Sequence, residues 1–79
     1  MTNKNFKRIS RGYREGFDCV GFGWFIEKAD IWGDIWYCVY KTDECRFDDD
    51  GYVETPALCF KKFETLKEAK AWCKDNTRQ

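Results

Sequence analysis

Residues 63–76 read FETLKEAKAWCKDN, and this stretch carries the clearest structural signal in the chain. Thr65 followed by Glu68 matches a capping box, in which each side chain satisfies a free backbone N–H group of the first helical turn. Apolar residues then recur at the spacing of one helical face: Leu66, Ala69, Trp72 and Cys73. The stretch predicts a helix over about residues 66–76, with Trp72 as its anchor to the rest of the fold.

Three β-prone segments precede this helix. Residues 17–27 (FDCVGFGWFIE) alternate large apolar residues with small ones, which predicts a strand. Residues 35–42 (IWYCVYKT) are dense in β-branched and aromatic residues and predict a central strand. Residues 43–51 predict a turn. Residues 52–63 predict a third strand that is an edge, or is broken, at Pro56, which cannot donate a ladder hydrogen bond.

These elements predict an α+β fold. Their local connections favour a three- to four-stranded antiparallel meander sheet with one C-terminal helix packed on one face, in the order β-β-β-α. We expect residues 1–79 to form a single domain, in which residues 1–14 are a basic mobile arm or a short edge strand. Because one helix covers only one face, we expect the other face to be exposed to solvent.

Residues 29–37 (ADIWGDIWY) hold two tryptophans on either side of a glycine. Gly33-Asp34 suits the centre of a tight type II′ hairpin turn, and a loop over about residues 28–34 is the favoured alternative. Both arrangements turn Trp32 outward. Trp36 lies on the more apolar face of the following strand, so we expect it in the core.

The tight turn conflicts with the alternation of residues 17–27. Carried back from that turn, the register places Phe25 on the same core face as Trp36, whereas the alternation groups Trp24 with Ile26. A bulge or the longer loop would remove the conflict, and we favour the loop.

The aromatic content points to a binding surface. Four Trp, four Tyr and seven Phe make up 19% of the chain, more than a core of this size can hide. Exposed Trp and Tyr are typical of protein interfaces, and an acidic loop would steer a basic partner. The candidate partner-binding residues are Trp32, Tyr37, Tyr40, Asp48, Asp49 and Asp50.

Charge is unevenly distributed although the net charge is zero. Residues 1–14 carry five basic residues and no acidic one, residues 15–60 are strongly acidic, and residues 61–79 are basic again. Cations interleaved with aromatic rings are typical of nucleic-acid contacts, although the basic arm could equally dock on the acidic middle. The candidate nucleic-acid-binding residues are Lys7, Arg8, Arg11 and Arg14.

Other function classes find little support. The chain has no histidine, and its five cysteines form no C-x-x-C pair, so we expect no catalysis, no metal and no cofactor. Cys19, Cys38, Cys59 and Cys73 lie in apolar stretches and are expected to be buried, whereas Cys45 lies in a polar loop. With no signal peptide and no membrane-spanning run, we expect a cytoplasmic protein.

Residues 59–76 (CFKKFETLKEAKAWCKDN) resemble the C-terminal end of many small orphan proteins of bacteriophages and mobile elements. The resemblance covers about a quarter of the chain and rests on a strand, a helix cap and a helix anchor, so no functional residue carries over. It implies an accessory protein of the host cytoplasm that blocks a host enzyme or defence complex, as anti-CRISPR proteins do.

Three hypotheses follow. The first is a phage-encoded, non-catalytic protein-binding module that inhibits or redirects a host protein through an exposed aromatic sheet face. The alternative is a small nucleic-acid-binding protein that uses the basic N-terminal arm and exposed aromatic residues. The third is a homodimer that buries the exposed sheet face on itself.

Overall fold

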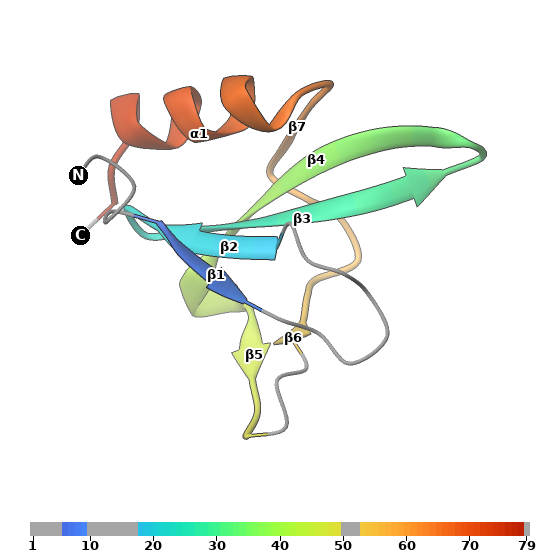
Figure 1. Cartoon of the computed structure of the whole chain (residues 1–79). Helices are drawn as coiled ribbons and strands as arrows, with labels where there is room; N and C mark the ends of the chain where they lie inside the picture. Colours follow the sequence, from blue (N-terminus) through green and yellow to red (C-terminus); the bar gives the residue numbers. More distant parts are fainter. Residues whose placement is uncertain (1–5, 10–17, 50–52, 79) are drawn as a thin grey trace.

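An antiparallel sheet with one helix on one face organises the chain (Figure 1). The computed structural model describes residues 6–9, 18–49 and 53–78. The main sheet has the strand order β1-β2-β3-β4-β7, and a separate two-stranded sheet pairs β5 with β6. The elements are β1 (Lys7–Ile9), β2 (Asp18–Gly21), β3 (Trp24–Ile31), β4 (Asp34–Lys41), the 3₁₀ turn η2 (Thr42–Glu44), β5 (Arg46–Phe47), β6 (Val53–Glu54), β7 (Lys61–Phe63) and α1 (Leu66–Asp75).

The predicted α+β class and C-terminal helix are confirmed. Helix α1 begins after Thr65, whose hydroxyl oxygen accepts a hydrogen bond from the backbone N–H of Glu68 at 3.2 Å. The Trp72 ring lies against Trp24 of β3, with 4.8 Å between ring centroids. The Trp24 indole in turn donates to the carbonyl of Asn76 at 2.8 Å, so the end of the helix is tied to the sheet.

Two tight turns, each an aromatic residue followed by glycine, shape the centre of the sheet. Phe22 (φ 59°) and Gly23 (φ 84°) connect β2 to β3, and Trp32 (φ 54°) and Gly33 (φ 88°) connect β3 to β4. Positive φ at both central residues is the pattern of a type I′ turn, whose twist matches that of the flanking strands.

These turns correct two expectations. The single strand predicted for residues 17–27 is wrong, because β2 ends at Gly21 and β3 begins at Trp24. The turn predicted at residues 33–34 and the alternative loop over residues 28–34 are also wrong, because the turn is centred on residues 32–33 and β3 stays paired through Ile31.

The structure agrees better with the predictions made for residues 35–42 and 52–63. Strand β4 is central, since it pairs with both β3 and β7. The third predicted segment is broken around Pro56: its first part is β6 of the small sheet, and its last part is β7 at the edge of the main sheet. With short β1 and β7 at its edges, the main sheet has five strands rather than three to four.

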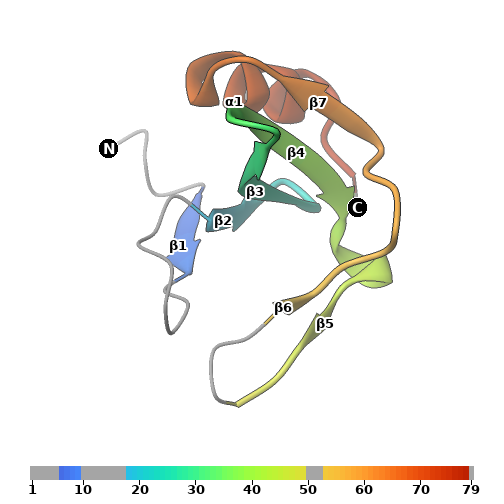
Figure 2. The ribbon, with the colours of Figure 1, turned by 90° about the vertical axis from the view of Figure 1, so that its right-hand side faces the viewer.

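Each face of the main sheet carries a core. On the helix side the buried residues are Cys19, Trp24, Ile26, Val39, Ala69 and Cys73. On the other side they are Phe25, Cys38 and Tyr40, flanked by Val20, Ala29, Trp36, Cys45, Val53 and Cys59. Figure 2 shows α1 on one side of the sheet and β5–β6 on the other.

The expectation of a solvent-exposed second face is therefore wrong. The chain between β4 and β7 crosses that face, where the Phe47 ring of β5 meets Phe25 edge-on at a centroid distance of 5.8 Å. This arrangement also removes the conflict over Phe25, because Phe25 belongs to one core while Trp24 and Ile26 belong to the other. Neither a bulge nor a longer loop is needed.

Candidate functional site

The outer half of the β3–β4 hairpin projects from the sheet (Figure 1). Strand β2 pairs with β3 as far as Ile26, and β7 pairs with β4 from Val39 to Tyr37. Beyond these points β3 and β4 pair only with each other, out to Ile31 opposite Asp34. We call residues 30–35, at the end of this two-stranded ribbon, the hairpin tip.

Trp32 at the apex of the hairpin tip is 97% exposed. Its positive φ of 54° is unfavourable for a residue with a β-carbon, by about 1–2 kcal/mol. Phe22 adopts the same conformation in the other turn, but its ring packs on the helix-side core and lies 5.2 Å from Phe6. Packing therefore explains the aromatic residue at Phe22 but not the one at Trp32.

Apolar and acidic residues surround Trp32. Ile31 and Ile35 are 37% and 41% exposed, and the register places them on opposite faces of the ribbon. Asp30 and Asp34 alternate with them, and the Asp30 carboxylate accepts a hydrogen bond from the Gly33 N–H at 3.0 Å, which fixes the turn. The hairpin tip thus presents one aromatic and two aliphatic side chains with two carboxylates between them.

Trp36, expected in the core, lies near the base of the ribbon, at the margin of the second core rather than within it. It is half-buried, and the Lys62 amine lies 4.8 Å from its ring centroid. Trp32, by contrast, is displayed, which agrees with the outward position predicted for it.

The two predicted tyrosines are not displayed with Trp32. Tyr37 is half-buried against the helix-side core. Tyr40 is only 8% exposed, and its hydroxyl donates to the Glu27 carboxylate at 3.2 Å. Burial and then the Glu27 charge raise the pKa of Tyr40. Tyr40 is therefore not displayed on the surface, because the crossing chain covers that face of the sheet.

The predicted charged sites lie on other elements. Asp48 and Asp49 are exposed after β5, away from the hairpin tip, and Asp50 lies outside the described residues. Lys7 and Arg8 lie on β1, where they pair with Val20 and Cys19. The basic arm continues through Arg11 and Arg14, which also lie outside the described residues.

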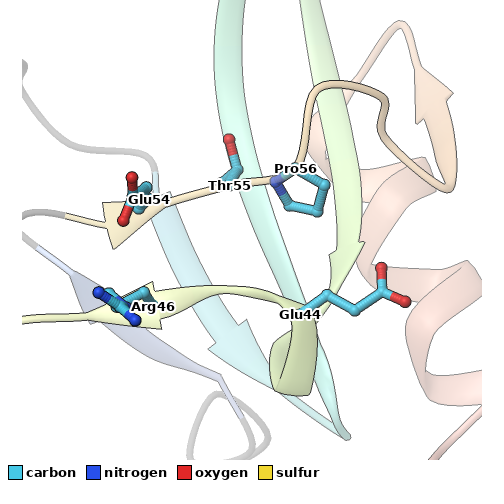
Figure 3. A pocket seen from close by; sticks show the side chains of 5 residues that line it. All are labelled: Glu44, Arg46, Glu54, Thr55 and Pro56. Atoms are coloured by element: carbon cyan, nitrogen blue, oxygen red, sulfur yellow. The ribbon is translucent and has the colours of Figure 1, made fainter.

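A shallow hollow of about 390 Å³ lies beside the small sheet (Figure 3). Its lining residues are Glu44, Arg46, Glu54, Thr55 and Pro56. Arg46 is the register partner of Glu54 across β5–β6, so the hollow pairs opposite charges rather than concentrating one. Across the described ranges, no group of three or more Cys, Asp or Glu side chains is placed to hold a metal ion.

The cysteines are free thiols. Cys19, Cys38 and Cys73 are buried as expected, whereas Cys59 and Cys45 are half-buried. Burial, and next the neighbouring Cys59, raise the pKa of Cys38 to about 12. Burial, and next Cys19, raise the pKa of Cys73 to about 12. Such thiols remain protonated at neutral pH and are poor nucleophiles.

Sequence reasoning identified Trp32 but missed the rest of the hairpin tip and three further exposed apolar residues, Phe47, Leu58 and Phe60. In the part of the chain that the structure describes, no helix has the length and apolar character to span a membrane. No protein-family model, curated protein or solved structure matches the chain.

Proposed function

We propose that this protein is a non-catalytic protein-binding module that inserts its hairpin tip into an apolar site on a partner protein. The observation that carries the proposal is Trp32, which is 97% exposed in a turn position that its own side chain disfavours. Burying one tryptophan removes about 200 Å² from water, which corresponds to a gross gain of about 5 kcal/mol. That gain is available only to a partner.

We therefore propose the hairpin tip, rather than a sheet face, as the partner contact. Trp32 is the central anchor, Ile31 and Ile35 extend the apolar contact, and the paired strands hold all three side chains on a short two-stranded ribbon. Interface hot spots are enriched in tryptophan and concentrate in well-packed pockets. Blocking a host protein in a phage-infected cell, the role implied by the resemblance of residues 59–76, requires such a contact and no catalysis.

The test is affinity capture from a bacterial lysate with three forms of the full chain: wild type, Trp32→Ala and Lys67→Ala. Lys67 is the control, because it is exposed on α1 and lies outside the hairpin tip. We expect a protein that wild type and Lys67→Ala retain and Trp32→Ala loses. For the purified partner, loss of a hot spot worth about 2 kcal/mol should weaken binding about 30-fold. A captured protein that binds all three forms equally would refute the role of the hairpin tip.

A further inference from the structure

A second surface lies at the β7 edge of the main sheet. Within the described residues, β7 has β4 as its one neighbour in the sheet order, so its other side is an open edge. In an antiparallel pair, alternate residues direct their N–H and C=O groups away from the partner strand. Those outward groups can pair with an added strand.

Lysines line both faces of this edge. Lys61 pairs with Val39 on the helix side of the sheet, and Lys62 pairs with Cys38 on the other side. Both are exposed, and their amines lie over aromatic rings, 5.7 Å from the Phe63 centroid and 4.8 Å from the Trp36 centroid. Lysines on an edge usually prevent strand addition, because an incoming strand of like charge is repelled. They repel a second copy of this edge but attract an acidic strand.

Exposed apolar side chains continue the edge at its N-terminal end. Leu58 is 84% exposed and Phe60 is 56% exposed, while Cys59 between them turns into the second core. The Phe60 ring is held in place by Trp24 and Trp72 at centroid distances of 5.1 and 5.9 Å, and the Lys41 amine lies 5.2 Å from its centroid. The surface therefore combines an open backbone edge, fixed apolar contacts and a positive charge.

We propose that the β7 edge, with Leu58 and Phe60, binds an extended acidic segment of a partner protein as an added antiparallel or parallel strand. Backbone hydrogen bonds supply affinity in such additions, and alternate side chains supply specificity. A polyanionic nucleic acid is a poorer fit, because it cannot complete the peptide ladder. This surface is separate from the hairpin tip and does not depend on the proposed function.

The test measures fluorescence anisotropy of a labelled short peptide of alternating glutamate and valine added to the full chain. The comparison probes are the same peptide with lysine in place of glutamate, the glutamate peptide N-methylated on every backbone amide, and a labelled oligothymidylate. We expect the glutamate peptide to bind at least about tenfold more tightly than each comparison probe, a difference of about 1.4 kcal/mol. The N-methylated peptide separates strand addition from simple charge attraction, because it keeps the charge and loses the ladder donors.

Charge-reversed variants locate the site. Lys61→Glu combined with Lys62→Glu should weaken the glutamate peptide at least about tenfold, whereas Lys67→Glu combined with Lys74→Glu, the same charge change on exposed positions of α1, should weaken it less than about threefold. Trp32→Ala should leave this binding unchanged, so the result is independent of the hairpin tip. Absence of binding by the glutamate peptide, equal binding of its N-methylated form, or tighter binding of oligothymidylate would each overturn the proposal.

Discussion

Replacing Trp32 by asparagine should make the protein more stable while removing its proposed binding anchor. Asparagine followed by glycine is the preferred pair in a type I′ turn, because the asparagine side chain tolerates positive φ. The Trp32 side chain is 97% exposed, so its removal costs almost no packing. Relief of a conformation that costs about 1–2 kcal/mol should therefore raise the free energy of unfolding by about 1 kcal/mol. In a domain of this size that corresponds to a rise of about 4–8 °C in Tm.

Urea and thermal unfolding followed by far-UV circular dichroism measure this change. Trp32→Ala is the matched control: alanine keeps a β-carbon at the same φ of 54°, so its stability should stay within about 0.5 kcal/mol of wild type. Phe22→Asn makes the same substitution in the other turn, where loss of the ring packed on Phe6 and the helix-side core should be destabilising. If Trp32→Asn instead destabilised the protein by about 1 kcal/mol or more, Trp32 would be stabilising the fold and the case for display would fail.

Three further predictions concern the rest of the fold. Gly33→Ala should lower the free energy of unfolding by about 1–2 kcal/mol from its φ of 88° alone, since nothing lies within 4 Å of the added β-carbon. Gly23→Ala should lower it more, because its β-carbon would lie 2.6 Å from the Arg78 β-carbon. Urea unfolding distinguishes the two variants. Thr65→Ala should lower the free energy of unfolding by about 1 kcal/mol through loss of the helix cap, and Thr65→Ser should restore most of it. Burial raises the pKa of Cys73 from 9.0 to about 12. The buried, protonated thiol therefore contributes its full stabilisation below pH 9, and this contribution is lost as the pH rises toward 12. Unfolding midpoints measured across this range should fall more for wild type than for Cys73→Ala.

The helix could be predicted because its signals are local. The cap at Thr65, the apolar stripe and the anchor Trp72 all lie within one short stretch, and each acts as the sequence indicates. The central strand was equally clear, because residues of β4 are dense in side chains that favour strands.

The turns could not be predicted by the same means. Phe22 and Trp32 adopt positive φ, which aromatic residues rarely do, so neither pair was identified as a turn. A turn shifted by one residue changes the strand pairing by two residues, so each side chain keeps its face, and the predicted turn places Phe25 and Trp36 on one face as the structure does. Ile31 and Ile35 are exposed because the β3–β4 ribbon extends beyond β2 and β7, which no local spacing indicates. The exposure of Trp32 is predicted correctly, because each alternative places it outward.

The second core could not be predicted from local sequence patterns. Whether Tyr40 and Phe25 are covered depends on where the chain between β4 and β7 crosses the sheet, and no spacing within that segment specifies this path. When both faces of a sheet are apolar, each face must be covered by other parts of the chain. The apparent conflict between Phe25 and its neighbours Trp24 and Ile26 is the sequence feature that indicates two such cores.

Because the two cores lie on opposite faces of one sheet, different parts of the chain should differ in how readily they open locally. Strands β1 to β4 are neighbours in both sequence and sheet, so they can pair through short loop closures, whereas β7 joins β4 only after the excursion through β5 and β6. That excursion covers the second core with short strands and half-exposed side chains. Its amide hydrogens should exchange through local opening, while those of β3 and β4 exchange only when the helix-side core is lost as well.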